Sequence, residues 1–292
     1  MVNLSITEAI NFLKEKNFNA YFEGDICIKM MPLTLEDVEN NGELETLKQE
    51  IDFIQRPNKE KLLRQIIYQL FEMEYIDKHK SIIDVGCWIG DNAIPWSFFI
   101  ENAVVHAIDP SEKNLNFAKN IASLNGKNNI NWVKSVCSDI VGEKLSFNGT
   151  LEQASFKKNI TDGHSILSNT LDNIINNSLF KKISLMHIDV EGFEKQTIKG
   201  ALEIIYSEKP VIIFEQHICS ENSMELIKLL KGFDYNVFMI NEILPGCQLD
   251  CRNFIAFNKN RKIPKLPKLN HAVGRQMNIF YASLDEALIK VT

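Results

Sequence analysis

The spacing of hydrophobic positions changes near residue 80. Before that point the clearest pattern is EKLLRQIIYQLFEMEY (60–75), in which apolar residues recur at helical spacing between charged ones. Pro57 and Asn58 stand directly before it, where a helix start signal is expected. We therefore predict that residues 1–80 form a mainly helical extension that packs on the rest of the protein.

From Ser81 onward, short apolar strands alternate with amphipathic helices. This alternation predicts a largely parallel sheet with helices on both faces. The last two strands are joined only by the loop NEILPGCQLDC, so one of them should run antiparallel to the rest. The predicted strands are 81–85, 104–108, 131–137, 184–190, 211–216, 235–240 and 253–257, and the predicted helices are about 92–101, 111–124, 193–207 and 221–231.

Two segments lack this rhythm. Residues 138–180 are long and irregular, and SFNGT and LEQASF within them suit a hairpin with a turn at Asn148-Gly149. We expect this segment, with polar groups such as Gln153, Asn159 and His164, to form part of an acceptor pocket. The tail contains KNRKIPKLPK, whose prolines oppose a regular element. The predicted domains are an extension over 1–80, a main domain over 81–258, and a tail over 259–292 that packs on it.

A glycine-bearing turn follows the first strand of the main domain, in IIDVGCWIGDNAI (82–94). Gly86 would let the backbone approach a ligand closely, and Gly90 would let the turn tighten before the next helix. The pattern D-x-G-x-x-x-G lacks the central glycine that accommodates a pyrophosphate in dinucleotide folds. A ligand without a pyrophosphate therefore fits better. Taken alone, the segment is equally compatible with a tight turn that binds nothing.

Acids at the ends of the next two strands add to this signal. The second strand, VVHAIDP, ends in Asp109-Pro110, and a carboxylate there can accept the hydroxyls of a ribose. The third ends in Ser138-Asp139, where groups near an adenine are expected. Two such acids, in order behind a glycine turn, predict a site for the adenosine of S-adenosylmethionine. The predicted cofactor-binding residues are Asp84, Gly86, Trp88, Gly90, Asn92, Asp109, Pro110, Ser138 and Asp139.

Several motifs in the main domain match one known family. Between about Ser81 and Asn258 the sequence resembles the FkbM family of S-adenosylmethionine-dependent methyltransferases. The matching motifs are IIDVGCWIG, the acid-proline pair at 109–110, TLDNI (170–174), IDVEGFEKQTIKGA (188–201) and KPVIIFEQH (209–217). Two positions depart from the family pattern. Asp109 stands where the family usually has glutamate, and Cys87-Trp88 stands where it tends to have small residues and asparagine.

The resemblance implies a Rossmann-like class I methyltransferase fold. This is an α/β fold with a seven-stranded, mostly parallel sheet that contains one antiparallel strand, here with the N-terminal helical extension. It also implies methyl transfer to oxygen, often on sugars, polyketides or other natural-product scaffolds. Trp88 would either shape the methionine and acceptor side or pack in the core.

The candidate catalytic residues lie at the ends of two strands expected to be neighbours. Asp189 and Glu191 are two residues apart, as are Glu215 and His217, so each pair should face one side in an extended chain. A hydroxyl acceptor must lose its proton to a base or to a metal-activated site. His217 or Asp189 is the predicted base, and the other carboxylates would bind the acceptor or a hard cation such as Mg²⁺ or Mn²⁺. Both versions stay open, and Glu194 is expected only to cap a helix.

Other polar residues suggest weaker sites. His217, Cys219, Cys247 and Cys251 could assemble into a zinc site, but C-x-x-x-C is a weak spacing and buried thiols are the expected outcome. His187 lies inside an apolar strand and is expected to be a core histidine. The six cysteines are scattered, which suits reduced thiols and predicts a cytoplasmic protein.

Composition narrows the function classes. The chain is 45% hydrophobic and 24% charged, as expected for a globular protein, and no apolar run is long enough to span a bilayer. A formal charge of −6 disfavours a broad nucleic-acid surface. The leading hypothesis is an O-methyltransferase with a glycan or small-molecule acceptor and no nucleic-acid partner. The alternatives are a nucleic-acid methyltransferase and a non-catalytic adenosine-binding scaffold. The end of strand four in IDVE argues against the nucleic-acid methyltransferase. The acceptor, metal dependence and oligomeric state are not indicated by the sequence.

Overall fold

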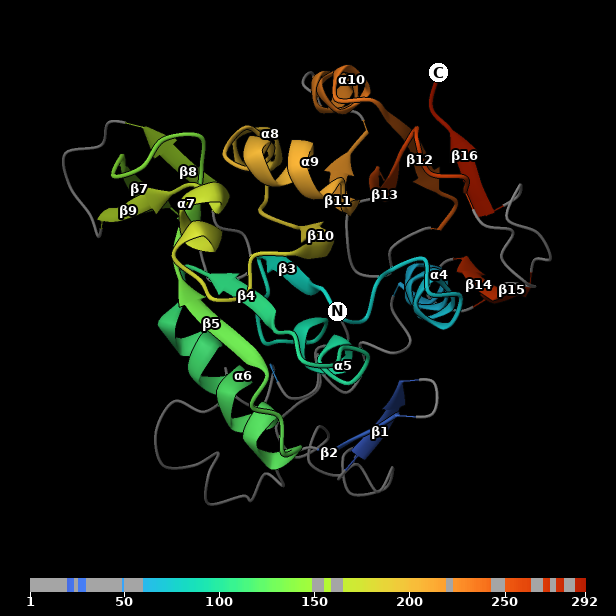
Figure 1. The fold of residues 1–292 in the computed structure, drawn as a ribbon, viewed down its shortest axis with the longest axis horizontal. Coiled ribbons are helices and arrows are strands. Elements are labelled where there is room, and N and C mark those ends of the chain that lie inside the picture. Colours follow the sequence, from blue (N-terminus) through green and yellow to red (C-terminus); the bar gives the residue numbers. More distant parts are fainter. Residues whose placement is uncertain are drawn as a thin grey trace.

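A twisted eight-stranded sheet forms the centre of the computed structural model, with helices on both faces (Figure 1). Its strand order is β16-β12-β13-β11-β10-β3-β4-β5. Strand β13 pairs antiparallel with both β11 and β12, and β16 pairs antiparallel with β12. The other strands share one direction. The structure describes residues 20–23, 26–29, 49, 60–148, 155–158, 165–218, 223–242, 250–263, 270–273, 277–280 and 287–292.

The central strands are buried on both faces, which is why they read as continuous apolar runs. All residues of β3 and β10 are buried, and successive side chains alternate between two cores. Ile82 packs in the core under α4, α5 and α6, whereas Ile83 packs in the core under α8, α9 and α10. The strands of the sheet are β3 (Ser81–Val85), β4 (Val105–Asp109), β5 (Ile130–Lys134), β10 (Ile183–Ile188), β11 (Val211–His217), β12 (Tyr235–Ile240), β13 (Cys251–Asn258) and β16 (Leu288–Lys290).

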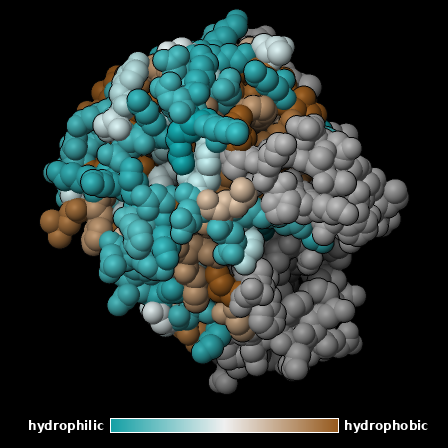
Figure 2. Space-filling view, turned by 45° about the vertical axis from the view of Figure 1, so that its right-hand side comes forward, coloured by the Kyte–Doolittle hydropathy of each residue, from teal (hydrophilic) through white to brown (hydrophobic). Residues whose placement is uncertain are grey.

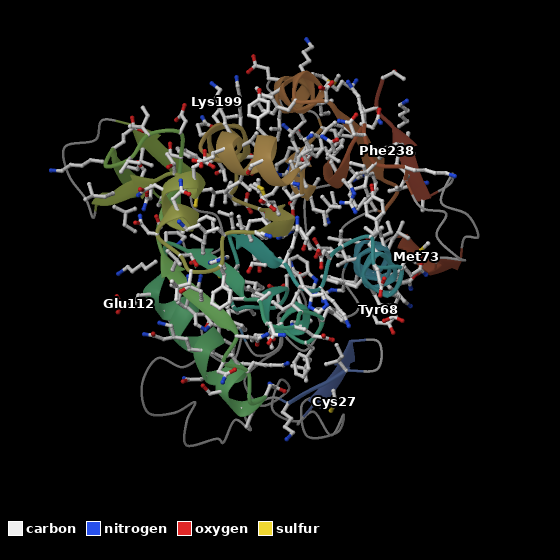
Figure 3. The ribbon with its side chains drawn as sticks, viewed as in Figure 1. Cys27, Tyr68, Met73, Glu112, Lys199 and Phe238 are labelled. Carbon is white, nitrogen blue, oxygen red and sulfur yellow. The ribbon has the colours of Figure 1, made fainter. Side chains whose placement is uncertain are left out.

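The helices lie in two layers, one on each side of the sheet (Figure 1). Glu112 at the start of α6 and Lys199 at the end of α8 point away from the body of the protein (Figure 3). The predicted helix over 193–207 is divided in two at Gly200, and the helix predicted over 92–101 is a single short turn. The helices of the two layers are α4 (Lys61–Glu72), α5 (Ala93–Trp96), α6 (Glu112–Leu124), α8 (Glu194–Lys199), α9 (Leu202–Glu208) and α10 (Ser223–Gly232).

The predicted fold class is confirmed, with a correction to the strand count. Each of the seven strands expected from the sequence is present. The sheet has eight strands because Leu288–Lys290 adds β16 beside β12, and two strands rather than one run antiparallel. A three-residue strand is too short to show a hydrophobic period, so the pattern could not predict it. The predicted strand 131–137 ends at Lys134, and Val136–Cys137 (β6) joins a second sheet.

The described part of residues 1–80 is not only helical. The expected helix is present as α4, but Ala20–Glu23 (β1) and Ile26–Lys29 (β2) form an antiparallel pair. Their sequences, AYFE and ICIK, contain the aromatic and β-branched residues that favour strands. That signal was present in the sequence, so the expectation of a mainly helical extension is incomplete for these residues.

The segment 138–180 adds three strands, at the upper left of Figure 1, to a small second sheet that also includes β6 and has the order β6-β9-β7-β8. The expected hairpin is confirmed, because β7 and β8 pair antiparallel. Its turn, together with Gln153, Asn159 and His164, lies outside the described residues. The elements added by this segment and by the tail are β7 (Lys144–Asn148), β8 (Ser155–Lys158), β9 (Ser165–Asn169), α7 (Leu171–Asn176), β14 (Asn270–Val273) and β15 (Met277–Phe280).

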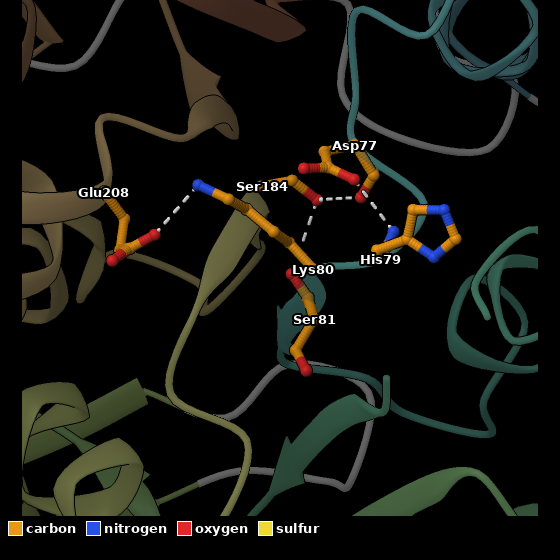
Figure 4. Close-up of polar contacts among 6 residues, drawn as sticks. All are labelled: Asp77, His79, Lys80, Ser81, Ser184 and Glu208. Carbon is orange, nitrogen blue, oxygen red and sulfur yellow. Dashed lines mark hydrogen bonds and ion pairs between the residues drawn. The ribbon is translucent and has the colours of Figure 1, made fainter. Parts of the chain in front are cut away.

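Polar contacts hold together the amino ends of the two central strands (Figure 4). Ser184 Oγ on β10 donates to the carbonyl of Asp77 at 3.1 Å, just before β3. Lys80 Nζ forms an ion pair with Glu208 at 3.0 Å, which ties the start of β3 to the end of α9. These contacts stabilise the amino ends of the strands. The candidate site lies at the opposite end of the sheet, at the carboxyl ends of the strands, where ligands bind in folds of this class.

Hydrophilic residues cover most of the described surface in the face shown by Figure 2, with hydrophobic residues in small separate groups. The most exposed large hydrophobic side chain described is Leu179, at 96%. None of the described helices has the length and hydropathy needed to cross a membrane.

Candidate active site

The glycine turn and Asp109 are joined directly by hydrogen bonds. The backbone N–H groups of Gly86 and Cys87 both donate to the carbonyl of Ile108, at 2.9 and 3.1 Å. The N–H of Trp88 then donates to Asp109 Oδ2 at 3.0 Å. The turn needs unusual backbone angles, with φ of +77° at Gly86 and +44° at Trp88. The carboxylate therefore lies against the turn at the carboxyl edge of the sheet.

Asp109 is desolvated, and it retains capacity for a ligand. Its side chain also accepts bonds from the Ser111 N–H at 2.8 Å and from Asn114 Nδ2 at 3.4 Å, both on Oδ1. Burial raises the pKa of Asp109 to about 7, against the effect of these donors. A carboxylate offers about four acceptor positions, so Oδ2, which accepts only from Trp88 among these contacts, can accept a further hydroxyl. This free acceptor capacity fits a hydroxyl donor such as that of the ribose of an adenosyl cofactor.

Asp84 lies beneath the turn. It is fully buried, and its Oδ1 is 2.8 Å from Nδ1 of His187 on the neighbouring strand. Burial alone would lower the pKa of His187, but the hydrogen bond and charge of Asp84 raise it overall. The ring of Trp96 packs edge-on against the imidazole. His187 is therefore a core histidine with a partner, as expected, and Asp84 supports the turn from below.

The other predicted cofactor residues lie around this centre. Asn92 is buried at the start of α5, and Trp88 is half-buried against the core. A Cβ on Gly90 would come 3.1 Å from side chains of α5, α6 and β5, a tight contact that adds to the preference for glycine set by its φ of +77°. Ser138 is buried and its Oγ donates to Asp139 at 3.2 Å, beyond β6. Pro110 directly follows Asp109 and leads into α6.

Gly86 also brings the glycine turn close to the end of β10, where Asp189 lies. The N–H of Asp189 donates to the carbonyl of Val85 at 3.0 Å. A Cβ added to Gly86 would lie 1.7 Å from the backbone carbonyl oxygen of Asp189. No side chain fits in that space, so only glycine permits this close approach. Asp189 is therefore fixed directly beside the turn.

The acidic and imidazole side chains end up together because of strand alternation. Asp84, Asp189, Glu215 and His217 lie at even spacing from apolar residues that pack in the core under α4 and α5. Even spacing on a strand places side chains on one face. The corresponding apolar residues are Ile82, Leu185 and Ile213.

The four predicted catalytic residues line one pocket. The pocket has a volume of about 180 Å³, and its walls come from the β10–α8 connection, the end of β11 and α10. The lining residues are Asp189, Glu191, Gly192, Glu194, Lys195, Glu215, Gln216, His217 and Leu226. None of the described residues of 138–180 is among them. The expectation that 138–180 lines the acceptor pocket therefore has no support from this pocket.

His217 has a carboxylate partner that sequence reasoning missed. Its Nδ1 lies 3.1 Å from Oδ1 of Asp250, the residue directly before β13. Strand β13 pairs antiparallel with β11, and His217 is in register with Cys251. Glu215 accepts a hydrogen bond from the Cys251 thiol. The signal for Asp250 was its position at the start of a strand expected to run antiparallel beside the candidate base.

The two glutamates after β10 have different roles. Glu191 has a left-handed backbone, with φ of +49°, and desolvation raises its pKa while the nearby His217 opposes this. Glu194 is buried and accepts a hydrogen bond from the Gly192 N–H at 2.9 Å. Its pKa is raised by burial. Glu194 therefore lies in the first turn of α8 and bonds the turn before it, whereas the N-cap residue of α8, Phe193, has no side-chain cap hydrogen bond.

Motif residues outside the pocket hold its scaffold. In TLDNI, Thr170 Oγ1 caps α7, and Asp172 accepts from the backbone N–H groups of Glu203 and Ile204 at the start of α9. A Cβ on Gly200 would lie 2.1 Å from the carbonyl oxygen of Ser138, so this glycine allows α8 and α9 to pack on the third strand end.

Within the described ranges, no three His, Cys, Asp or Glu side chains are arranged to hold one metal ion. The weak zinc alternative includes Cys219 and Cys247, which lie outside those ranges. Cys87, Cys137 and Cys251 are buried and are not in a disulfide.

The sheet order and the turn-and-carboxylate site together define a class I methyltransferase fold. The family model for the methyltransferase FkbM domain matches residues 84–243. This match covers more than half of the 292 residues, and the chain belongs to the FkbM methyltransferase family. A comparison with curated proteins gives no match.

Three solved structures illustrate the likeness in fold. The FkbM methyltransferase of Methylobacillus flagellatus KT is 17% identical, with a TM-score of 0.43, over 62% of this chain and 44% of that one. This chain therefore spans less than half the length of that protein. A precorrin-6y C5,15-methyltransferase from Geobacter metallireducens GS-15 is 11% identical, with a TM-score of 0.42, over 67% and 89%. An rRNA methylase from Streptococcus thermophilus is 14% identical, with a TM-score of 0.41, over 66% and 94%.

Proposed function

We propose that this protein is an S-adenosylmethionine-dependent O-methyltransferase that acts on a hydroxyl of a sugar, glycan or other small molecule. The observation that carries the proposal is the His217–Asp250 pair, because His217 lines an acid-lined pocket whose Asp189 lies directly beside the glycine turn. An imidazole held by a carboxylate is a suitable base for a hydroxyl, and the turn with Asp109 is a suitable nucleoside site.

The chain's own residues would bind and orient the reactants. Asp109 would accept hydrogen bonds from the ribose, with the turn backbone against the adenosyl group. When bound, S-adenosylmethionine supplies a methyl group already activated on a sulfonium sulfur. The remaining task for the protein is to align the acceptor oxygen with that methyl and to remove the hydroxyl proton.

His217 is the proposed base. Asp250 contacts Nδ1, and Nε2 is the nitrogen that we propose takes the acceptor proton. As the new bond from oxygen to the methyl carbon forms and the sulfur–carbon bond breaks, that proton would pass to Nε2. Asp189, Glu191 and Glu215 are acceptor groups that suit the several hydroxyls of a sugar.

The metal-assisted version makes a different prediction. If Mg²⁺ or Mn²⁺ activates the hydroxyl, EDTA should stop turnover, and either ion should restore it. If His217 acts as the base without metal, chelation should have no effect, and the rate should rise with pH through the range in which histidine loses its proton.

The reduced state of the described cysteines suits the cytoplasmic location that we propose.

The proposal is tested in two steps. Calorimetry should show S-adenosylmethionine binding to the full chain, and a screen with radiolabelled methyl donor should find turnover with sugar or glycan acceptors. His217→Ala should lose turnover but keep cofactor affinity, whereas His79→Ala, far from the pocket, should keep both. Methylation of RNA but no glycan would favour the nucleic-acid alternative. Binding of the cofactor with no acceptor in any class would favour the scaffold.

A further inference from the structure

We propose that Gln49, in the segment that precedes the family domain, is a positioning residue for the cofactor site. It would fix the side-chain amide of Asn114, which in turn holds the Asp109 carboxylate. The inference rests on the proposed function, because it takes Asp109 as the residue that binds the ribose. The family model matches residues 84–243, so Gln49 lies outside the matched part of the chain.

Three buried polar side chains form a chain of contacts through the protein. Gln49 Nε2 donates to Asn114 Oδ1 at 3.0 Å, and Asn114 Nδ2 donates to Asp109 Oδ1 at 3.4 Å. Gln49 is 3% exposed and Asn114 is 2% exposed. Hydrogen bonds in such an interior are stronger than in water, and linked bonds strengthen one another. A change at Gln49 should therefore be felt at the carboxylate.

The orientation of the Asn114 amide is the physical link. An asparagine amide accepts at Oδ1 and donates only at its nitrogen. Because Gln49 donates to Oδ1, the nitrogen must face Asp109. Without that donor, the amide loses one of the two contacts that select this orientation, and only Asp109 holds it. A flipped amide would place its oxygen against the carboxylate, where two acceptors repel each other.

A second contact ties the same part of the chain to the glycine turn. Arg64 on α4 donates through Nη2 to the backbone carbonyl of Asp91 at 3.3 Å, and Asp91 directly follows Gly90. Arg64 is itself buried. Residues before the family match are thus linked to both parts of the proposed nucleoside site, to the carboxylate through Asn114 and to the turn through Arg64.

The charges around Asp109 determine the direction in which its pKa should change when the Asn114 bond is lost. Burial and the charge of Asp84 raise the pKa of Asp109 to about 7, while the Ser111 and Trp88 N–H groups and Asn114 lower it. Lys134, in register on β5, is paired with Glu112. Loss of the Asn114 bond should raise the pKa of Asp109 further. Cofactor binding needs the ionised carboxylate. As the pH is lowered, binding should therefore be lost at a higher pH than in the wild type.

The test is calorimetry of the full chain with S-adenosylhomocysteine between about pH 6 and pH 9. Gln49→Met keeps the length of the side chain but removes both polar atoms. The matched control is Asn125→Ala. Asn125, at the end of α6, exchanges hydrogen bonds with the Lys29 backbone at 2.6 and 2.9 Å. It therefore also ties the N-terminal segment to α6, but at the end of the helix remote from Asp109.

Gln49→Met should weaken cofactor binding by about threefold to tenfold at neutral pH. It should also shift to higher pH the point at which binding is lost on acidification. Asn125→Ala should change neither, even if both variants lose thermal stability. If Gln49→Met does not fold, Asn114→Ala tests the same shift. This inference alone would be overturned if Gln49→Met binds the cofactor with wild-type affinity and wild-type pH dependence while Asp109→Ala binds it more weakly. Unchanged affinity in Asp109→Ala would overturn the cofactor assignment, and this inference with it.

Discussion

At the scale of single residues, the strongest expectation concerns Asp109. Asp109→Ala removes a carboxylate that bonds the turn and would bond the ribose. Charged hydrogen bonds are each worth about 1.5–3 kcal/mol, so affinity for S-adenosylmethionine should fall more than tenfold. Titration calorimetry measures this directly, with circular dichroism to confirm folding. A folded variant with unchanged affinity would remove Asp109 from the site.

His217 and Asp250 should behave as a base and its positioning residue. His217→Ala should reduce kcat by about 100-fold or more, as is typical for loss of a general base, while the Kd of the cofactor stays near wild type. Asp250→Asn should reduce kcat less and move the acid limb of the rate profile to lower pH, because the negative charge beside the imidazole is lost. Asp250→Glu should recover part of the rate.

Steady-state kinetics across pH separates this role from a structural one. A purely structural Asp250 would affect stability but leave the shape of the pH profile unchanged. Glu215→Gln provides a comparison within the same pocket. It should abolish or strongly reduce turnover through the acceptor side, again with near-normal cofactor binding. Full activity in these variants with an accepted substrate would contradict the assignment of the pocket.

At the scale of elements, helix α4 depends on a carboxylate far away in sequence. Glu242, just after β12, accepts hydrogen bonds from the N–H groups of Leu62 and Leu63, at 2.9 and 3.3 Å. Burial, with the charge of Glu60, raises the pKa of Glu242 to about 7 from 4.5, while these donors and Arg64 oppose the shift. The native state therefore holds this proton more tightly than the unfolded chain does.

It follows that Glu242 makes the free energy of unfolding fall as pH rises from about 4.5 to about 7. Glu242→Gln keeps an acceptor oxygen without a charge, so this part of the fall should disappear. Glu242→Ala leaves the N–H groups without the carboxylate and should cost about 1–3 kcal/mol at about pH 5.5. Urea unfolding at several pH values gives both quantities. Parallel pH curves for wild type and Glu242→Gln would contradict the buried-charge explanation.

Elements with a long hydrophobic period could be predicted from the sequence, and those without one could not. Strands β3 and β12 have the predicted bounds because their apolar runs end at polar or glycine residues. Strand β16 could not be predicted, since three residues carry no period. The candidate site followed the same rule. Asp189, Glu215 and His217 could be placed together from strand alternation, whereas Asp250 and Gln49 depend on pairing across the fold.

At the scale of the whole molecule, the position of the pocket predicts which segments an acceptor should protect from hydrogen exchange. Its walls come from the β10–α8 connection, β11 and α10, and not from the described residues of 138–180. Acceptor binding should therefore protect the backbone amides of 190–196 and of α10 from hydrogen exchange. Mass spectrometry with cofactor alone and with cofactor plus acceptor separates the two effects. Protection confined to 138–180 would restore that segment as the acceptor site.

The close approach of Gly86 to the Asp189 carbonyl also limits how a new acceptor specificity could be obtained. The backbone on that side of the pocket cannot move away without disturbing the turn that holds the cofactor. Variation therefore has to enter through side chains on the opposite wall, where Leu226 of α10 contributes an apolar group to a largely charged lining. A directed-evolution library that aims at bulkier acceptors should start at Leu226 and leave Gly86 unchanged.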